Sequence, residues 1–415
     1  MPTPRWPYPA VLVLTAVMLG VSGAPAPLYG IYAEQWGFAP ITTTVVFAVY
    51  AAAALSSVLV TGAISDRYGR RPVLLVAIVL VLVGLVVFAL ADGVVALVVA
   101  RALHGWGVGA VVVAGSAALL DLRPDAGARA GLHSGVAFNL GIAVTVLLVS
   151  LDAELGPAPL VTPYVVLAVL TLLGAVAVLA MREPHTQDRA VRLNVARPRV
   201  PAAIRPDFRF SALGVMAAWS VLGVFLSLFP TIAAHAVGTT NLAFGGSVVA
   251  ISAGVAALSQ AVGARFAARS AAVVGDLGTA ASLLLCIGAV ALGDPVVLLA
   301  TSAVLGVFFG LAFGASLRHL GQVVPAGHRG EVMSAFYVLA YTAMVVPTLL
   351  AGWAATVWGA EDVLAPFLVL VAVACTAAGL LGLRVRGVAP DEPVDAPGAH
   401  GSADGTATER PVRAG

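Results

Sequence analysis

The chain has 415 residues, of which 60% are hydrophobic and 10% are charged, whereas ordinary soluble domains contain about 25% charged residues. A soluble core cannot absorb this much apolar surface without exposing large patches, so a soluble fold is excluded. The net charge of +2 comes from arginines scattered over short loops, and this distribution argues against binding of nucleic acid.

Twelve apolar runs follow one another along the chain, each with roughly the 20 residues that a membrane-spanning helix needs. They start near residues 10, 44, 73, 94, 132, 160, 209, 241, 271, 295, 331 and 364. We therefore predict an all-α membrane protein with twelve transmembrane helices. The first run also resembles a signal peptide, because Arg5 precedes it and Ser22-Gly23-Ala24 resembles a cleavage site. With eleven further runs behind it, we interpret it as the first helix.

A polar segment rich in arginine and proline, residues 182–207, divides the runs into two sets of six. We predict an N-terminal six-helix bundle over residues 1–181, a cytoplasmic linker over 182–207 and a C-terminal six-helix bundle over 208–386. The last segment, residues 387–415, is rich in Pro, Gly, Asp and Ala and contains few large apolar residues. Such a composition predicts a disordered cytoplasmic tail.

The two sets of six runs look related. Three features recur at an offset of about 200 residues: Ala89–Val95 as Ala291–Val297, Gly105 and Gly109 as Gly306 and Gly310, and the turn with Pro124 and Arg129 as that with Pro325 and Arg329. A constant offset over three features indicates a duplicated unit, so we predict two pseudo-symmetric six-helix bundles. Parallel repeats that bind substrate at their interface are a known plan of transporters.

The charged residues of the loops indicate the orientation. With a cytoplasmic N-terminus, the inside segments hold the linker arginines and Arg5, Arg67, Arg70, Arg71, Arg123, Arg129, Arg265, Arg269, Arg318 and Arg329. The outside loops hold only acids, namely Glu34, Asp92, Asp152, Glu154, Asp294, Glu361 and Asp362. The positive-inside rule then predicts a multi-pass protein of the bacterial inner (cytoplasmic) membrane with both termini in the cytoplasm.

The segment Gly62–Arg71, GAISDRYGRR, lies between the second and third apolar runs. Insertion of an arginine into a membrane costs about 2.5–3.5 kcal/mol, so this segment marks a short cytoplasmic turn. Its spacing, G-x-x-x-D-R-x-G-R-R, closely resembles the loop signature of the major facilitator superfamily of secondary transporters. The alternative is that the arginines only fix the topology, but topology alone does not require Asp66 and two glycines at these spacings.

In that superfamily the loop after the second helix helps to latch the outward-open state. The resemblance implies that Asp66 faces the N-terminus of the eleventh helix near Gly330, where the helix dipole favours an anion. It also implies that Arg70 pairs with Asp121. One departure is Glu331, which would compete with Asp66 for the same helix end. The resemblance thus assigns a conformational latch to Gly62, Asp66, Arg67, Gly69, Arg70, Arg71 and Asp121.

The fourth apolar run carries Arg101, about a third of the way in from its expected outer end, and a charge within a span is a functional candidate. The segment resembles the superfamily's fourth-helix motif, an arginine followed by closely spaced glycines, which is often linked to proton-coupled systems. The alternative is that Arg101 snorkels to the outer headgroups. His104 lies one turn below on nearly the same face. It is a candidate proton carrier, because imidazole titrates near neutral pH, or else a packing residue.

Other polar residues in the spans are few, and singly each is more often a packing residue than part of a cavity. We predict a substrate and proton pathway that includes Arg101, His104, Tyr50, Asn139, Trp219, Gln260, Tyr337 and Tyr341. No Asp or Glu is expected deep in a span, since Asp276 falls within the first turns of the ninth helix. Proton coupling is therefore expected at Arg101 with His104, at Glu34 or at Asp66.

These features predict a transporter that moves a small hydrophobic or amphipathic organic solute by alternating access, with proton-coupled export as the first hypothesis. Proton-coupled uptake of a small metabolite is the alternative, because the fifth-helix segment Gly135–Gly141 lacks the proline typical of drug–proton antiporters. A non-transporting membrane scaffold is the third hypothesis. In a scaffold the loop signature should be eroded, whereas the signature Gly62–Arg71 of this chain is intact. Cys286 and Cys375 lie in apolar runs, and no metal-ligand or nucleophile–base pattern occurs, so we expect no enzyme activity, metal or cofactor. The expected partners of the monomer are a small-molecule substrate, protons and the lipid bilayer, with no nucleic acid.

Overall fold

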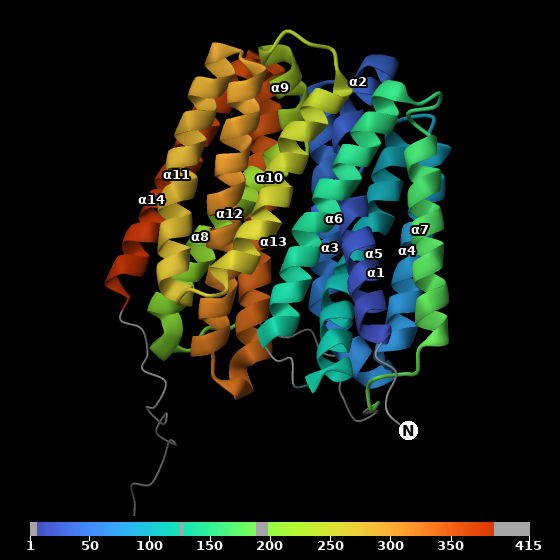
Figure 1. Cartoon of the computed structure of the whole chain (residues 1–415), viewed down its shortest axis with the longest axis vertical. Coiled ribbons are helices and arrows are strands. Elements are labelled where there is room, and N and C mark those ends of the chain that lie inside the picture. Colours follow the sequence, from blue (N-terminus) through green and yellow to red (C-terminus); the bar gives the residue numbers. More distant parts are fainter. Residues whose placement is uncertain (1–5, 125–127, 188–197, 386–415) are drawn as a thin grey trace, which may run out of the picture. The chain divides into compact units, whose positions relative to one another are not determined.

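Figure 1 shows the computed structural model of the chain, which describes residues 6–124, 128–187 and 198–385. The other segments, among them the expected tail over 387–415, lie outside the described residues. Within the described ranges all regular secondary structure is helical, with no strand. Twelve stretches there are long and apolar enough to cross a membrane, which confirms the predicted number of spans.

The helices form two sets, which we call the N-terminal half (α1–α7) and the C-terminal half (α8–α14). The N-terminal half contains α1 (Pro7–Gly23), α2 (Tyr29–Trp36), α3 (Pro40–Tyr68), α4 (Arg70–Ala89), α5 (Val94–Leu122), α6 (Ala128–Leu155) and α7 (Thr162–Ala180). The C-terminal half contains α8 (Arg205–Phe225), α9 (Phe229–Ala236), α10 (Leu242–Gly263), α11 (Ala268–Leu292), α12 (Pro295–Val323), α13 (Arg329–Trp358) and α14 (Ala360–Arg384). Since α8 begins at Arg205, the last residues of the expected linker 182–207 are helical.

The first spanning helix of each half is interrupted. In the N-terminal half, α1 ends at Gly23 and a short 3-10 turn precedes α2, with Pro25 and Pro27 in the break. In the C-terminal half, α8 ends at Phe225 and α9 follows after three residues, with Pro230 in its first turn. Proline lacks an N–H and clashes with the preceding turn, so a helix ends before it. The matching breaks support a duplicated unit.

Glycines let one pair of helices approach closely at equivalent places in the two halves. A side chain at Gly105 or Gly109 of α5 would collide with the α3 backbone, at Tyr50 and Ala54 respectively. Gly306 and Gly310 of α12 meet the α10 backbone in the same way, at Ser252 and Ala256. Small residues of this kind allow backbones to touch in membrane proteins. The recurrence found in the sequence therefore corresponds to the same helix contact, made once in each half.

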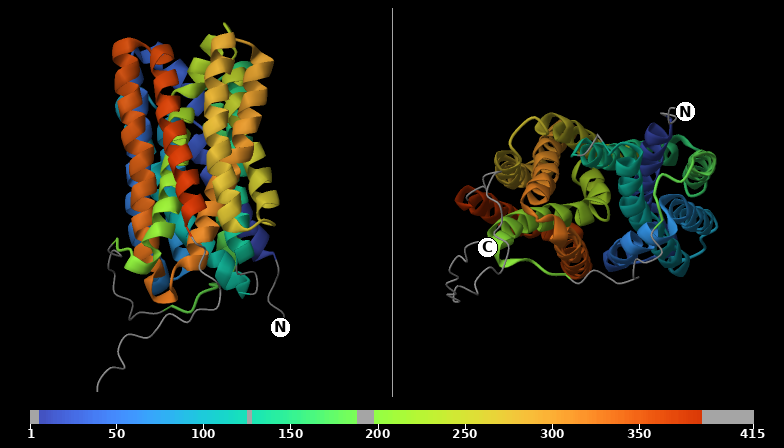
Figure 2. Two further views of the ribbon diagram at one scale, coloured as in Figure 1. Left: turned by 90° about the vertical axis from the view of Figure 1, so that its left-hand side faces the viewer. Right: turned by 90° about the horizontal axis from the view of Figure 1, so that it is seen from below.

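The two ends of the bundle differ in charge. We call the end with the α3–α4 turn (Arg67, Arg70 and Arg71) the arginine end, and the opposite end, with Glu34 and Asp152, the acidic end. The N-terminal end of α1 lies at the arginine end and α2 at the acidic end (Figure 1). Seen from the arginine end, the two halves stand side by side (Figure 2). At their interface α6 packs against α10, and α3 packs against α13.

Candidate functional site

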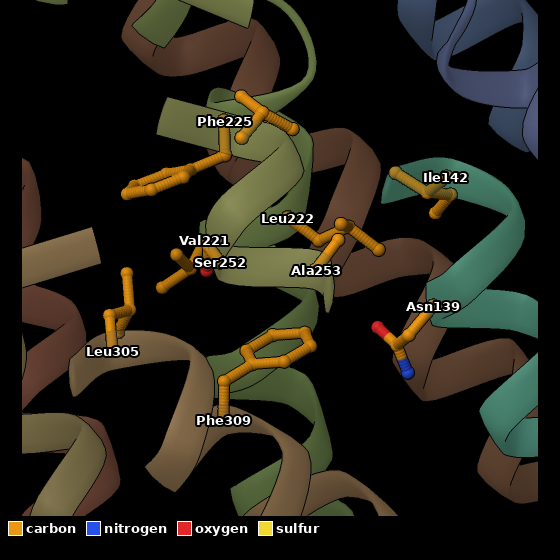
Figure 3. A pocket seen from close by; sticks show the side chains of 10 residues that line it. Asn139, Ile142, Val221, Leu222, Phe225, Ser252, Ala253, Leu305 and Phe309 are labelled. Atoms are coloured by element: carbon orange, nitrogen blue, oxygen red, sulfur yellow. The ribbon is translucent and has the colours of Figure 1, made fainter. Parts of the chain in front are cut away.

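A small cavity lies between the halves, where α6 faces α8, α10 and α12 (Figure 3). Its volume is about 30 Å³, which is room for one or two water molecules. It is lined by Asn139, Ile142, Val221, Leu222, Phe225, Val249, Ser252, Ala253, Leu305 and Phe309. Asn139, which the sequence predicted for the pathway, and Ser252 supply the polar side chains. The eight apolar lining residues could not be predicted from the sequence, because most residues of a membrane-spanning helix are apolar.

Four aromatic rings from both halves meet close to this cavity, and we call them the aromatic cluster. Trp219 of α8 stands edge-on to Tyr341 of α13, with ring centroids 4.8 Å apart. Trp219 also lies 6.0 Å from Phe313 of α12, which in turn lies 6.3 Å from Phe138 of α6. Two of these residues, Trp219 and Tyr341, were predicted for the pathway, and they are in direct contact.

Gln260 and Tyr337, also predicted for the pathway, lie between helices nearer the arginine end. The Gln260 side chain fits between glycines of both halves, Gly135 of α6 and Gly314 of α12. It is buried, and its Nε2 atom has no hydrogen-bond partner among the described residues. Tyr337 packs edge-on against Phe336 and contacts the main core. Gln260 is therefore a buried polar group at the interface of the halves.

Arg101 of α5 is fully buried, with 0% exposure. Its Nε and Nη2 atoms donate to the Tyr29 hydroxyl at 2.8 and 2.6 Å, and Nη1 donates to the Ser22 carbonyl at 2.8 Å. The guanidinium also faces the rings of Tyr29, Phe47 and Tyr50 at 5.1–5.8 Å, a distance at which cation–π attraction operates. The snorkelling alternative is wrong, since a snorkelling arginine would reach solvent. The predicted pathway residue Tyr50 belongs to this group, which we call the Arg101 cluster.

His104 lies on the side of α5 that faces α4. Its ring is 5.1 Å from the ring of Phe88 and presses on Gly84, where a side chain would collide with it. The imidazole is fully buried and is not among the side chains that line the cavity at Asn139. His104 and Arg101 thus share a helix, while their side chains contact different neighbours.

The predicted latch residues lie around the turn between α3 and α4. Gly69 has a φ of +101°, which favours glycine over residues with a side chain. Arg70 follows it, and its Nη1 atom donates to Ser65 Oγ and Asp66 Oδ1, both at 2.6 Å. Its Nε donates to Asp121 Oδ2 at 2.9 Å, so the structure contains the pairing that the resemblance implies. The Arg67 guanidinium lies 5.6 Å from the ring of Tyr68, whereas Gly62 lies near Val113 of α5.

The implied contact between Asp66 and α13 is not formed in this structure. Asp66 of α3 bonds across the turn to Arg70 of α4, and no hydrogen bond joins it to α13 in the described part of the chain. Glu331, the competing acid, occupies the first turn of α13 and lies 3.2 Å from His328 Nδ1. The carbonyl of Glu331 also accepts a hydrogen bond from Arg199.

Sequence reasoning missed Glu183, which follows α7. Its Oε1 and Oε2 atoms accept hydrogen bonds from the backbone N–H groups of Arg70 and Arg71, at 2.8 and 2.9 Å. The carboxylate therefore caps the N-terminus of α4, where a helix favours negative charge. Two residues on, His185 Nδ1 lies 3.3 Å from Asp121 Oδ2. The sequence contained no signal for Glu183 beyond an acid in an arginine-rich segment, which also contains Asp188 and Asp207.

The equivalent turn of the C-terminal half, residues 263–269, is held differently. Arg269 donates to the carbonyls of Gly382 and Leu383 at the end of α14, just as Arg71 donates to those of Val178 and Leu179 at the end of α7. Arg318 of α12 binds the carbonyls of residues 263 and 264 at 2.9 and 3.0 Å. An arginine thus replaces the acid network found in the first half.

Two buried acids of the C-terminal half were not predicted as site residues. Asp207, placed in the linker by the sequence, lies in the first turn of α8, and its Oδ1 is 2.8 Å from His319 Nε2 on α12. Both side chains are only 5% exposed. Asp276 lies within the first turns of its span, as the sequence placed it, but it has 0% exposure, so its neighbours bury this acid although it lies near the arginine end of α11. The polarity of the sequence around Asp207 cannot reveal that His319, far away in the chain, bonds to it.

Hydrogen bonds between the two halves lie at the acidic end. The N–H of Ile41 at the start of α3 donates to Thr356 Oγ1 of α13 at 3.0 Å. The N–H of Leu242 at the start of α10 donates to Glu154 Oε2 of α6 at 2.9 Å. These two hydrogen bonds join the halves at the acidic end.

A sequence profile of the Major Facilitator Superfamily matches residues 11–271. Among solved structures, the chain is similar to the human organic anion transporter MFSD10 (TETRAN), with 17% sequence identity and a TM-score of 0.66. This alignment covers 92% of the present chain and 100% of MFSD10. Identity at that level shows a common fold only. A search among curated proteins gave no match.

Proposed function

This chain belongs to the major facilitator superfamily and is therefore a multi-pass secondary transporter, and we propose that it exports a small hydrophobic or amphipathic organic solute in exchange for protons. The proposal includes a bacterial inner-membrane location with the arginine end in the cytoplasm, which the positive-inside rule favours. It also includes a monomer as the working unit, since one chain supplies both halves around the cavity.

The observation that carries the substrate class is the lining of the central cavity. Eight of its ten residues are apolar and none is charged, and the adjoining aromatic cluster adds two Phe, one Trp and one Tyr. Apolar and aromatic walls with a few placed polar groups suit hydrophobic ligands. Asn139 and Ser252 would fix the orientation of a polar substituent.

An organic anion, the substrate class named for MFSD10, is less favoured here. An anion needs a positive partner in the pathway. The buried cation of this interface region, Arg101, already donates to Tyr29 and Ser22 and is covered by three aromatic rings. Binding of an anion at Arg101 would require these bonds to open first.

During alternating access, contacts between the halves would break at one end of the bundle and form at the other. Opening of the acidic end breaks the bonds at Thr356 and Glu154. The halves then approach each other at the arginine end, where Asp66 faces the N-terminus of α13 and completes the latch. In this proposal the Arg70–Asp121 pair orients the turn in both states, whereas the Asp66 contact forms in the outward-open state alone.

Transport is tested in membrane vesicles with an imposed pH gradient and a panel of labelled hydrophobic and amphipathic compounds. We expect movement of at least one compound, opposite to the proton flow and abolished by a protonophore. Asn139→Leu should reduce it, and the neighbouring Leu140→Val should not, because Leu140 is 48% exposed on the outer surface of the bundle. Movement with the proton flow would instead support uptake. If no compound moves in response to the gradient, the scaffold hypothesis stands.

The orientation is tested separately with single cysteines and an impermeant label applied to intact cells. Cysteines in place of Glu34, Asp152 and Glu361 should react from outside. Those in place of Arg70 and Arg329 should be protected until the membrane is permeabilised. Labelling of the second group in intact cells would contradict the proposed orientation.

A further inference from the structure

Asp276 is a buried acid without a partner. It is the ninth residue of α11 (Ala268–Leu292), about 12 Å along the helix from its arginine end at 1.5 Å per residue. Its exposure is 0%, and neither carboxyl oxygen has a hydrogen-bond partner in the described part of the chain. An ionised carboxylate in such a place is costly unless something neutralises it.

Two neighbouring helices enclose the carboxyl group. Gly214 of α8 lies directly against it, since a Cβ atom at this position would be 2.7 and 2.9 Å from the two carboxyl oxygens. Gly275, next to Asp276, contacts the backbone of α12 at Leu311 and Ala312. The carboxyl group is therefore held where α8, α11 and α12 meet.

Three hydroxyl groups on these helices are likewise buried and without a hydrogen-bond partner among the described residues. Ser211 lies one turn before Gly214 on α8, Thr279 one turn after Asp276 on α11, and Ser316 one turn after Ala312 on α12. Residues three or four apart share a helix face. Ser211 therefore shares a face with Gly214, Thr279 shares one with Asp276, and Ser316 shares one with Ala312, which meets Gly275. Each of the three hydroxyl residues has 0% exposure, and none has a hydrogen-bond partner among the described residues. Buried polar groups are normally paired.

The other titratable groups around Asp276 do not supply a counter-charge. Cys375 approaches it from α14 and is buried. Toward the arginine end, α8 carries Arg209, which is exposed, and Asp207, and α12 carries Arg318 and His319. Asp207 and His319 bond to each other. No salt bridge connects Asp276 to any described residue. The nearby arginines bind backbone carbonyls instead: Arg269 of α11 binds a carbonyl of α14, and Arg318 of α12 binds one of α10. No described residue therefore supplies the missing partner of Asp276.

We propose that Asp276, with the hydroxyls of Ser211, Thr279 and Ser316, binds one small monovalent cation, a proton or Na⁺. A proton neutralises the carboxylate and lets it donate to a hydroxyl, whereas Na⁺ takes the oxygen ligands that hard cations prefer. The site is linked to the cavity through α8, which carries Gly214 at the site and Val221 and Leu222 at the cavity. This coupling rests on the proposed transport function, but the binding site itself does not.

The test uses the purified full-length protein without substrate or gradient. The infrared C=O band of a protonated carboxylic acid is followed between alkaline and acidic buffer. Thermal unfolding is compared in NaCl and KCl, since a ligand of the native state raises Tm. The variants are Asp276→Asn, which keeps the size without the charge, Ser211→Ala, and the control Asp92→Asn in an exposed loop.

A pH-dependent band that is lost in Asp276→Asn and retained in Asp92→Asn identifies a proton site. A rise in Tm that is specific to NaCl and lost in Asp276→Asn identifies a Na⁺ site. In either case Ser211→Ala should shift the midpoint of the effect, which is a pH for the infrared band and a Na⁺ concentration for the rise in Tm. If Asp276→Asn does not fold, the proposal is tested with Ser211→Ala alone. Identical behaviour of wild type and both site variants would overturn the proposal. Since neither measurement involves transport, a positive result without transport would refute the proposed function alone.

Discussion

The two halves of the molecule each bury a charge, and they treat it differently. In the N-terminal half, Arg101 makes three hydrogen bonds to Tyr29 and Ser22 and lies among three aromatic rings. In the C-terminal half, Asp276 has no partner at all among the described residues. The first charge is solvated by hydrogen-bond acceptors and aromatic rings of the protein itself. The second depends on what the medium supplies, so a duplicated fold has acquired one fixed and one responsive charge.

The turns at the arginine end differ in a related way. In the N-terminal half, the turn is organised by acids, since Asp66, Asp121 and Glu183 all bind Arg70 or its backbone. In the C-terminal half, Arg269 and Arg318 bind only carbonyl oxygens. Side-chain ion pairs can be exchanged for others during a conformational change, whereas helix-end carbonyls stay in place. This contrast predicts that a latch operates in the first half only.

The strongest expected effect is on the fixed charge. Arg101→Lys keeps the charge but loses the fork that reaches Tyr29 and Ser22 together. Each lost hydrogen bond to a charged group is worth about 1.5–3 kcal/mol, so we expect a loss of about 3–5 kcal/mol in stability, measured by unfolding of the purified protein. Arg101→Met should be less harmful, because it also removes the cost of burying the charge. An Arg101→Lys protein as stable as the wild type would contradict the role of the Arg101 cluster.

Removal of one acceptor should have an intermediate effect. Tyr29→Phe keeps the ring over the guanidinium but deletes the hydroxyl that accepts two of its hydrogen bonds. Because both bonds share one acceptor oxygen, we count them as one, at a cost of about 1.5–3 kcal/mol in the free energy of unfolding. Tyr32→Phe is the matched control, since its hydroxyl bonds only to the neutral Tyr164 hydroxyl at 3.1 Å and its loss should cost about 1 kcal/mol. Equal destabilisation of the two variants would argue that charge plays no part.

The contrast between the turns is sharpened by a pair of variants. Arg70→Ala should remain in the membrane but slow transport, because a bias of about 1–3 kcal/mol between the two states changes their populations by about 5–150-fold. Arg269→Ala, at the equivalent turn, should transport at close to the wild-type rate. Initial rates in vesicles, normalised to the amount of protein, provide the comparison. Similar slowing in both variants would mean that the turns act alike.

The smallest expected effect concerns the helix cap. Glu183→Gln leaves one amide oxygen for the two N–H groups of Arg70 and Arg71, and it removes the charge at the start of α4. Losses of this kind cost about 0.5–1 kcal/mol, which is measured as a small decrease in Tm. Glu34→Gln, an exposed site, should leave Tm unchanged. A decrease as large as that of Tyr29→Phe would show that Glu183 supports more than a cap.

The spans could be predicted because they depend on composition alone. A run of about 20 apolar residues has few alternatives to a membrane helix, and the helices begin close to the expected residues, for example Val94 and Pro295. The Arg70–Asp121 pair was accessible through the family resemblance, since the loop signature contains Arg70 and the resemblance implies that Asp121 is its partner. Asn139 was accessible because a polar residue stands out in an apolar run.

The remaining site features depend on contacts between distant segments. Asp207 looked like part of a polar linker, because only the fold brings His319 next to it. Asp276 looked shallow, since its position in α11 says nothing about the cover that α8 provides through Gly214. Glu183 required the end of α7 to lie beside the start of α4. In each case the sequence contains the residue, and packing gives it its surroundings.

The interrupted first helices have a mechanical consequence. At the break in the N-terminal half, the Ser22 carbonyl is held by Arg101 of another helix, so this elbow cannot straighten unless a charge-assisted bond breaks. At the break in the C-terminal half, the Ser227 hydroxyl binds the Gly223 carbonyl of its own segment, and the rings of Phe225 and Phe229 stack at 4.0 Å. Among the described residues no hydrogen bond joins residues 225–230 to a helix other than α8 and α9, so this break can bend without breaking such a bond. We therefore expect the break between α8 and α9 to bend more easily than the break between α1 and α2. Bending of the bundle should concentrate in the C-terminal half, which contains Asp276.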